Sequence, residues 1–555
     1  MKNFKMLTAC IMLGAISMQA QVVQTAWTDR YDGPGNNEDF VYAMVLDDQG
    51  NIYVTGSSTG PETSFDYATV KYSPEGERQW VSRYNLPGNG ALWDIPKAMA
   101  IDKMGYVYVT GMCGDPQIDG KYVAVTIKYD HDGDTVWTHR YGGPENGIDW
   151  LSTEAIAVDD KFNVFITGTA DIGFAPGLQD NVVFTVKYNP YGDTLWTRKY
   201  RQPDSYSDCA YALVIDSFDN PVIAGTAQSP VYPNHDDILI IKYGAGGDTL
   251  WIQTYDGPDG RQEIPSAMLI DAANNIYITG ISKNAQNHFD YLTMKYDAGG
   301  TRQWVSRYDG PGEWHDEAQD IAVDMNGYCY VTGFSRGIGT WNDIATIKYN
   351  PEGDTVWVRR FNGLNDSQDG GEAIAVDQQG NVYVTGVESV PVTWGDFVTI
   401  KYDADGNEQW IERLAGPGGY DLPVAIAVDQ AGSVVVTGIN FGDDSAEDFL
   451  TVKYTQSGVN IEKPCNQATS GTIMLDIHPN PLTTSTLISW RLQAHGHVIL
   501  KIFDLLGNEV APLVQADMPS GNHQVVFNAV NLPAGIYFIR ISLENQIIVK
   551  KIIKL

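Results

Sequence analysis

One segment of this chain is repeated eight times, and no other feature limits its possible folds as strongly. Each unit contains a glycine-closed strand such as YVTG, then a Lys-Tyr pair, then a turn with glycine and a tryptophan, as residues 50–80 illustrate. Successive tryptophans of the pattern are 53 to 59 residues apart. A nearly constant period of this size is typical of propellers and solenoids, in which each repeat is one supersecondary unit. The eight tryptophans are Trp27, Trp80, Trp137, Trp196, Trp251, Trp304, Trp357 and Trp410.

The pattern inside one unit predicts four strands. Residues 40–47, 52–58, 66–73 and 79–84 form short segments separated by turns rich in Gly, Asp, Asn and Pro. The first segment alternates apolar and polar positions, and the apolar spacing of a helix is absent. A unit of four antiparallel strands is the blade of a β-propeller. The sequence therefore predicts an all-β fold.

The two ends of the repeat region complement each other. The last unit has three strands, ending at Lys453 and Tyr454, and no strand with a tryptophan follows. Residues 27–31 (WTDRY) form a fourth strand with no unit before them. Pairing these ends would complete the last blade and leave no open edge, whereas a linear solenoid needs polar capping repeats. We therefore predict an eight-bladed β-propeller closed by an N-terminal strand.

The regions outside the repeats define the other predicted domains. Residues 1–20 carry Lys2 and Lys5, then an apolar run, then Ala20, which predicts a signal peptide. The propeller is expected at 21–454 and a polar linker at 455–472. Residues 473–555 contain short alternating segments that predict a small C-terminal Ig-like β-sandwich. We expect no transmembrane segment, because no apolar stretch is long enough.

Charge and metal-ligand spacing exclude several classes of function. The chain has 69 acidic and 36 basic residues, a formal net charge of −33. Such a surface repels nucleic acid and anionic lipid, so neither is an expected partner. The five cysteines and nine histidines show neither a disulfide framework nor zinc spacing. A zinc-type centre is therefore not expected.

The residues shared by the units form a specific succession. In the first unit it consists of Asp47, GNIYVTG at 50–56, Asp66, Lys71, Tyr72, Gly76 and Trp80. This succession resembles the SBBP-type β-propeller repeats of bacterial secreted proteins, a resemblance that implies no established activity. The turn with its tryptophan, as in DHDGDTVW, also resembles the tryptophan-docking repeats of eight-bladed quinoprotein dehydrogenases. That resemblance implies that each tryptophan packs one blade on the next.

The C-terminal region carries a second set of shared residues. They are Pro479, Asn480, Pro481, Asp504, Leu505, Gly507, Val510, Gly521, Leu532, Gly535, Tyr537, Lys550 and Lys551. Together they resemble the type A C-terminal sorting domain of the Bacteroidetes type IX secretion system. The resemblance implies three partners: the secretion machinery, its sortase-like protease and surface lipopolysaccharide. The expected location is extracellular or on the outer-membrane surface.

Two charged positions recur in all units, a lysine before tyrosine and an aspartate that ends the first strand. For both we predict turn capping and ion pairing between neighbours. The lysines are Lys71, Lys128, Lys187, Lys242, Lys295, Lys348, Lys401 and Lys453, and the aspartates are Asp47, Asp102, Asp159, Asp216, Asp271, Asp324, Asp377 and Asp429.

A third acidic position stands eight residues before that aspartate. If the first strand is innermost, these acids surround the mouth of a central channel. Capping of backbone N–H groups is one interpretation, and a cation held by several carboxylates, calcium by its preference for oxygen, is the other. The residues are Asp39, Asp94, Asp208, Glu263, Asp316, Asp369 and Asp421, with Asp149 displaced by an insertion.

Variable loops gather on one predicted face. Because strand direction alternates, connections between strands two and three and between units share a face, while the opposite face has short hairpins. Exposed aromatic residues on such loops suit stacking on sugars or anchoring a protein, but rings that merely seal gaps between blades are an equal alternative. The candidate ligand-binding residues are Trp93, Trp150, Trp314, His315, Trp341, Trp394 and Tyr420.

Three functional hypotheses follow. The evenness of the units favours a non-enzymatic secreted or cell-surface propeller that binds an extracellular glycan or protein, and no catalytic residue is assigned. A carbohydrate-active hydrolase or lyase would use carboxylates at the channel mouth such as Asp94, Asp149 or Asp316. A quinoprotein-like dehydrogenase would share the tryptophan turns, but its cofactor site would require a departure from the repeat that the loops lack.

Overall fold

The computed structural model forms two compact units, Met1–Val459 and Asn460–Leu555. None of the described residues forms a helix long and apolar enough to cross a membrane. The predicted signal peptide, most of the predicted linker and Trp394, Asp149, Pro479, Asn480, Pro481 and Gly507 lie outside the described residues. The structure describes residues 21–555 except 89–91, 117–120, 144–147, 149, 174–179, 204, 206, 229–234, 364–365, 391–394, 417–418, 442–445, 459–473, 479–483, 493–494, 504–508, 531, 534, 544–545 and 555.

Within the described part of the first unit, β1 to β32 form eight four-stranded antiparallel sheets. Seven sheets take four consecutive strands each. They are β2 (Asp39–Leu46), β3 (Ile52–Thr59), β4 (Phe65–Tyr72) and β5 (Arg78–Tyr84); β6 (Asp94–Ile101), β7 (Val107–Asp115), β8 (Lys121–Tyr129) and β9 (Thr135–Tyr141); β10 (Trp150–Val158), β11 (Val164–Asp171), β12 (Asn181–Tyr188) and β13 (Thr194–Tyr200); β14 (Asp208–Ile215), β15 (Pro221–Gln228), β16 (Asp236–Tyr243) and β17 (Thr249–Tyr255); β18 (Glu263–Ile270), β19 (Ile276–Lys283), β20 (Phe289–Tyr296) and β21 (Arg302–Tyr308); β22 (Asp316–Val323), β23 (Cys329–Arg336), β24 (Asn342–Tyr349) and β25 (Thr355–Phe361); β26 (Asp369–Val376), β27 (Val382–Glu388), β28 (Asp396–Tyr402) and β29 (Glu408–Leu414).

The remaining sheet joins both ends of the repeat region. Its order is β1 (Gln21–Tyr31), β32 (Glu447–Gly458), β31 (Val434–Phe441) and β30 (Leu422–Val428). β1 pairs antiparallel with β32 from Gln21 opposite Gly458 to Tyr31 opposite Phe449, which is the pairing that the sequence predicts. β32 runs to Gly458, so the boundary predicted at residue 454 lies inside the strand and is too early.

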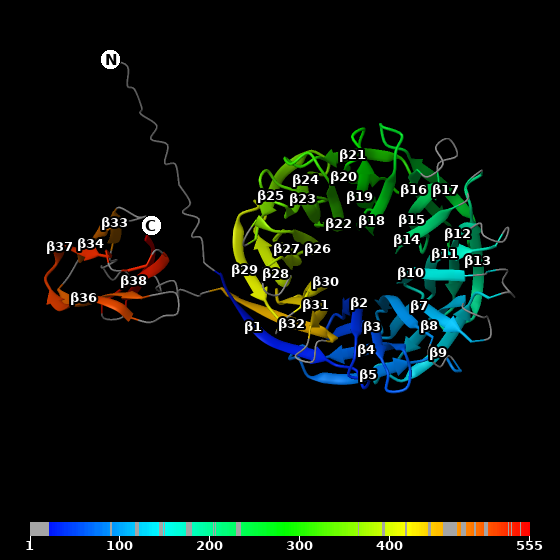
Figure 1. Ribbon diagram of the computed structural model, residues 1–555, viewed down its shortest axis with the longest axis horizontal. Coiled ribbons are helices and arrows are strands. Elements are labelled where there is room, and N and C mark those ends of the chain that lie inside the picture. The colour runs from blue at the N-terminus through cyan, green and yellow to red at the C-terminus, as the bar shows by residue number, and fades with distance from the viewer. Residues whose placement is uncertain are drawn as a thin grey trace, which may run out of the picture. The chain divides into compact units, whose positions relative to one another are not determined.

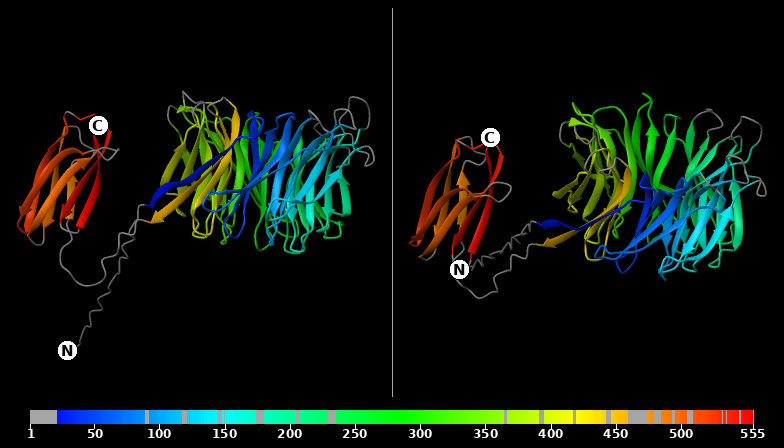
Figure 2. Two further views of the ribbon diagram at one scale, coloured as in Figure 1. Left: turned by 90° about the horizontal axis from the view of Figure 1, so that it is seen from below. Right: turned by 60° about the horizontal axis from the view of Figure 1, so that its bottom comes forward.

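The sheets are arranged as a ring, and their strands run between its two faces (Figures 1 and 2). First strands such as β10, β14 and β22 lie on the inside, and fourth strands such as β5, β13 and β1 form the rim (Figure 1). The second and third strands are almost entirely buried, which explains their apolar and β-branched composition. The hydrophobic clusters lie between neighbouring sheets. One of them joins Tyr31, Phe449 and Val435 to Val41 and Ala68.

Each repeat tryptophan docks on the next sheet, as the resemblance implies. In seven of the eight junctions its indole N–H donates to a carbonyl in the third hairpin of that sheet, and in most of these the repeat lysine donates to the same oxygen. Pro74 O, for example, accepts from Trp27 at 3.1 Å and from Lys453 at 3.2 Å. The turn glycine beneath the ring must lack a side chain, because a Cβ on Gly353 (φ +91°) would lie 2.6 Å from Trp304. The carbonyls belong to Pro74, His131, Pro190, Ala245, Ala298, Pro351 and Ala404.

The eighth junction uses a different acceptor. The closing sheet has no hairpin between β32 and β1, since those strands come from opposite ends of the chain. The side chain of Gln456 takes its place: its Oε1 accepts from Lys401 Nζ at 2.6 Å and from Trp410 Nε1 at 3.3 Å. Its Nε2 donates to Gly432 O at 2.6 Å and Tyr383 Oη at 3.2 Å. Gln456 therefore completes the ring from within a segment predicted to be linker.

The recurring aspartates cap the first hairpins. Asp47 accepts backbone N–H groups from Gln49 and Asn51, and the same pattern recurs in the other units. Repeat lysines form ion pairs with these aspartates within one sheet: Lys187 with Asp159 at 3.5 Å, Lys242 with Asp216 at 2.8 Å and Lys453 with Asp429 at 3.0 Å. The predicted capping is confirmed, whereas the repeat lysine contacts the next sheet through a hydrogen bond to the turn carbonyl, as Lys242 does with Ala298 O.

The described residues of the second unit form two sheets that share one core. One has the order β33 (Met474–His478), β34 (Ser485–Leu492), β37 (Gly521–Asn528), and the other β36 (Glu509–Met518), β35 (Gly496–Phe503), β38 (Gly535–Leu543), β39 (Gln546–Lys554). Trp490 and Phe527 of the first sheet lie in the same cluster as Leu500 and Ile541 of the second. Tyr537 is buried, and its hydroxyl donates to Pro533 O at 3.0 Å.

Candidate functional site

Five of the predicted ligand-binding aromatic residues are well exposed at one end of the ring. We call this end the loop face: it is where first strands begin and second strands end. Topology places all five there, because each lies at the start of a first or third strand or in the connection just before it. Their exposed fractions are 49% for Trp93, 37% for Trp150, 50% for Trp314, 54% for Trp341 and 46% for Tyr420.

Trp93 and Trp314 also pack on the preceding sheet. Trp93 makes an edge contact with Phe65 at 5.9 Å between centroids, and Trp314 lies 4.4 Å from the ring of His288. His315 accepts the backbone N–H of Phe289 at 3.2 Å. Burial, with His288 nearby, lowers the pKa of His315. These side chains therefore seal gaps between sheets with one part of their surface.

Trp341 and Tyr420 are brought together by the fold. Both line a cavity of about 760 Å³ on the loop face, with Phe334, Gln368, Asp369, Glu372 and Val387 among the other lining residues. The Arg336 guanidinium lies 4.3 Å from the Trp341 ring centroid, and Tyr420 packs on Gly395. Both rings are thus held in place without losing their exposure.

Glu372 is a residue of this cavity that the sequence does not reveal. It occupies a β-bulge in β26, between Gly371 and Ala373, which brings its carboxyl to the cavity wall. Burial raises its pKa to about 7. Burial also raises the pKa of the Tyr420 hydroxyl, and the nearby Glu372 carboxylate raises it further. The cavity therefore combines two aromatic walls with an acid that exchanges its proton near neutral pH.

Every inner strand has a bulge at the same place. The bulged residues differ from sheet to sheet, although the flanking residues follow the repeat, and some of them touch across sheets: Lys97 Nζ lies 5.0 Å from the Tyr42 ring centroid. Diverse side chains at one position of a regular scaffold suit selective recognition. The residues are Tyr42, Lys97, Glu154, Tyr211, Ser266, Gln319, Glu372 and Val424.

The acids proposed to surround the channel mouth are buried caps. Asp316 accepts the N–H groups of Gly310 at 2.6 Å and Arg336 at 3.0 Å, and Asp369 accepts those of Gly363 and Ser389. Asp39, Asp94, Asp208, Glu263 and Asp421 are equally buried. Among the described residues, carboxylates close enough to share a cation form three separate groups rather than one ring.

Burial of these acids predicts an unusual pH dependence. It raises the pKa of Asp94 to about 7 and the pKa values of Asp39 and Asp369 to about 6, from ordinary values near 4. The folded state therefore binds more protons than the unfolded state between about pH 4 and 7, and this stability is lost as pH rises through 7. In a buffer that contains a metal chelator, we therefore expect the unfolding temperature of the protein to rise when the pH is lowered from about 8 to 6.

Asp94→Asn gives the control for this prediction. The neutral side chain keeps the acceptor for Leu86 N, so the variant should show a smaller change over the same pH range. A wild-type unfolding temperature that falls on acidification from pH 8 to 6, measured by differential scanning fluorimetry, contradicts the prediction.

Two protein-family models match this chain. The beta-propeller repeat SBBP matches residues 31–61, and the secretion system C-terminal sorting domain matches residues 476–555. A WD repeat-containing protein of Acanthamoeba polyphaga mimivirus is 23% identical over 509 residues, covering 77% of this chain and 32% of that protein. The chain therefore spans about a third of the length of this curated relative.

Solved structures with similar architecture include PorZ, a bacterial surface component of the type-IX secretion system of Porphyromonas gingivalis. PorZ has a TM-score of 0.38 and 14% identity, with 93% of this chain and 65% of that chain covered. The WD40 domain of fission yeast SCAP has a TM-score of 0.43 and 9% identity over 78% of this chain and 98% of that chain. The polysaccharide lyase Uly1 has a TM-score of 0.39 and 11% identity over 74% and 89%.

The family matches bear out the resemblances to SBBP repeats and to the type IX sorting domain. The match at residues 31–61 begins at the end of β1 and extends past β3, and the match at residues 476–555 covers nearly all of the second compact unit. The chain is therefore an all-β protein with SBBP-type β-propeller repeats and a type IX secretion C-terminal sorting domain that marks it for the cell surface or the extracellular space.

Proposed function

We propose that this chain is a secreted or cell-surface eight-bladed β-propeller that binds an extracellular glycan in the cavity between Trp341 and Tyr420. The eight sheets are its blades, and the C-terminal unit is an Ig-like sandwich that serves export. The observation that carries the proposal is the coincidence, in one cavity, of two exposed and immobilised aromatic rings with amide and carboxyl groups. Sugars bind by stacking on aromatic faces while their hydroxyls pair with such groups.

Export accounts for the remaining partners. After passage through the outer membrane, the sorting domain is cleaved from the propeller by the sortase-like protease, and the propeller is released or attached to lipopolysaccharide. Cleavage within residues 459–473, which follow β32 in the sequence, would leave that strand intact. The acidic surface keeps the propeller soluble and directs recognition away from anionic polymers.

Glu372 supports a second candidate function, a glycan hydrolase or lyase. A carboxyl group with a pKa of about 7 can donate and accept a proton at neutral pH, as general acid-base catalysis requires. Asp369 lines the same cavity, but its oxygens already accept two backbone N–H groups. The cavity therefore offers one unengaged acid rather than the pair that glycoside hydrolysis uses, which favours binding.

Binding is tested with a glycan array probed with the chain from residue 21 to 555. Glycans retained by the wild type should bind Trp341→Ala and Tyr420→Ala roughly tenfold to a hundredfold more weakly, the loss typical of a central aromatic contact. Trp93→Ala is the matched control, because Trp93 is exposed on the same face but does not line the cavity. Its affinity should stay within about twofold of the wild type.

Four results distinguish the candidates. Binding is supported if the wild type retains an unaltered glycan and Trp341→Ala does not. An enzyme is supported if the wild type releases shortened or unsaturated products and Glu372→Gln does not. Equal loss in Trp93→Ala and Trp341→Ala contradicts the cavity as the site. A protein ligand is indicated if no glycan is retained and Trp341→Ala and Tyr420→Ala, but not Trp93→Ala, weaken a surface-protein complex.

A further inference from the structure

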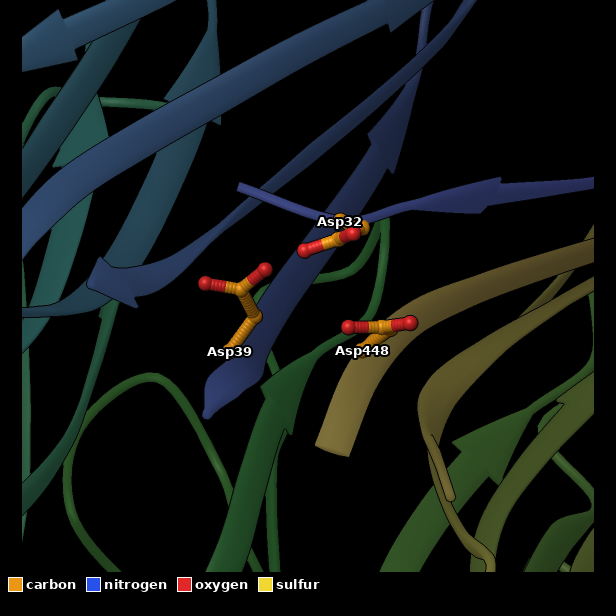
Figure 3. Close-up of side chains that lie close together, drawn as sticks. All are labelled: Asp32, Asp39 and Asp448. Atoms are coloured by element: carbon orange, nitrogen blue, oxygen red, sulfur yellow. The ribbon is translucent and has the colours of Figure 1, made fainter. Parts of the chain in front are cut away.

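Three acidic side chains meet at the junction between the β14–β17 sheet and the β18–β21 sheet. Asp237 lies on β16, Asp256 follows β17, and Glu263 begins β18. One carboxylate oxygen from each lies within 4.8 Å of the other two. Two equivalent groups exist among the described residues, one of which consists of Asp32, Asp39 and Asp448 from three separate segments (Figure 3). The other consists of Asp290, Asp309 and Asp316.

The three groups differ in one residue of the fourth strand. Arg30 pairs with Asp448 at 2.5 Å, and Arg307 pairs with Asp290 at 2.9 Å. Arg30 is the register partner of Leu450, and Arg307 of Leu292. At the equivalent place in β17, the partner of Leu239 is Thr254. The group of Asp237 therefore lacks the guanidinium that neutralises its two counterparts.

Two oxygens of this group are buried without a partner. Asp237 is 8% exposed and Glu263 is fully buried. Asp237 Oδ1 and Glu263 Oε2 have no hydrogen-bond partner, while Glu263 Oε1 accepts from Ser282 at 2.8 Å and the Glu263 carboxyl also interacts with the backbone N–H of Gly257. Arg307 of the next sheet is engaged with Asp290 and Ser282 O, and lies 3.5 Å from Asp259. A buried carboxylate oxygen with no donor is costly, so a cation or a proton bound here would stabilise the group.

The electrostatics of the group agree with this geometry. Burial raises the pKa of Asp237 to about 7, and the charges of Asp256 and Asp236 add to the effect. Burial likewise raises the pKa of Glu263 to about 7, and Asp256 and Asp237 contribute. Both shifts come from burial beside other carboxylates, so a cation bound among the three oxygens would relieve this repulsion.

We propose that Asp237, Asp256 and Glu263 bind a hard divalent cation of the calcium type, which occupies the place of the missing arginine. Calcium takes carboxylate oxygens at about 2.3–2.6 Å, and three carboxylates from two sheets match its preference for several oxygen ligands completed by water. The ion would tie the fourth sheet of the chain to the fifth. This inference concerns a different junction from the glycan cavity and does not depend on the proposed function.

The first test is direct binding measured with Ca²⁺ by isothermal titration calorimetry on the chain from residue 21 to 555. Wild-type protein should bind Ca²⁺ with a dissociation constant at or below about 1 mM, the range of extracellular modules. Asp256→Asn should weaken this binding at least tenfold. Asp256 is exposed, so this substitution should not impair folding. Asp309→Asn, at the equivalent position beside Arg307, is the control and should leave Ca²⁺ binding unchanged.

The second test replaces the ion with the arginine found in the other groups. Thr254 is exposed, so Thr254→Arg fits its surroundings. This variant should have a higher unfolding temperature than the wild type in a chelator and should no longer gain stability from Ca²⁺. Absence of Ca²⁺ binding by the wild type overturns the proposal, as does a Ca²⁺ response that persists unchanged in both Asp256→Asn and Thr254→Arg.

Discussion

A chain that begins at Asp32 instead of Gln21 will not form a stable ring. Without β1 the chain loses three interactions: the hydrogen bond from the Trp27 indole to Pro74 O, the Arg30–Asp448 ion pair and the packing of Tyr31 on Phe449. β32 is left with an unpaired edge from Phe449 to Gly458. Exposed edges of this length promote aggregation. We expect the unfolding temperature to fall by on the order of 10 °C, with loss of a single cooperative transition.

The control for the shortened chain is a variant that alters β1 without removing it. Thr28→Ala changes β1 on its own while keeping the strand and its backbone pairing with Val452. Differential scanning calorimetry of this variant should show a shift of no more than about 2 °C. A shortened chain that unfolds within that same shift would mean that β1 is dispensable and that the closed ring is wrong.

Gln456→Ala should be among the most destabilising single substitutions in the chain. It removes an acceptor of the buried Lys401 ammonium group and the acceptor of the Trp410 indole, and it leaves Gly432 O without the Gln456 amide. Burial already lowers the pKa of Lys401, so its charge is sensitive to the loss of a partner. Hydrogen bonds to charged groups contribute about 1.5–3 kcal/mol each, so we expect a loss of about 3 kcal/mol or more in the free energy of unfolding.

Thr455→Ala is the neighbour that calibrates this effect. Thr455 is exposed, and its hydroxyl makes a 3.4 Å contact with Gln24 O, so its substitution should cost less than about 0.5 kcal/mol. Denaturant titrations of both variants measure the difference. A Gln456→Ala variant as stable as Thr455→Ala would show that the eighth junction does not depend on a side-chain substitute for the missing turn.

The sequence predicts the parts of this molecule that repeat. Tryptophan spacing, turn glycines and apolar strands identify the four-stranded units, because each has the same physical role in every copy. The pairing of residues 27–31 with the last unit follows from counting strands. The sequence also singles out Trp341 and Tyr420, because aromatic side chains in variable loops depart from the repeat; the structure shows that both are exposed and line one cavity.

The features that the sequence does not predict are residues that differ from the repeat in one unit only. Their roles depend on which side chains the folded sheets bring together. Glu372 faces the cavity because a bulge shifts its strand by one residue, and no local pattern marks a bulge. Gln456 follows the last repeat and resembles the polar residues after it, so it was assigned to the linker. The significance of Thr254 emerges only when Asp237, Asp256 and Glu263 are seen to meet across two sheets.

Glycan binding in the cavity between Trp341 and Tyr420 is tested most directly by fluorine NMR. The protein is labelled with 5-fluorotryptophan and titrated with the glycan that the array retains. Trp341→Phe assigns one resonance, and Trp93→Phe and Trp314→Phe assign two controls on the same face. We expect the Trp341 resonance to shift in proportion to the fraction of protein that has bound glycan, while the Trp93 and Trp314 resonances keep their positions. A ligand that shifts Trp93 or Trp314 and leaves Trp341 unmoved would contradict this expectation.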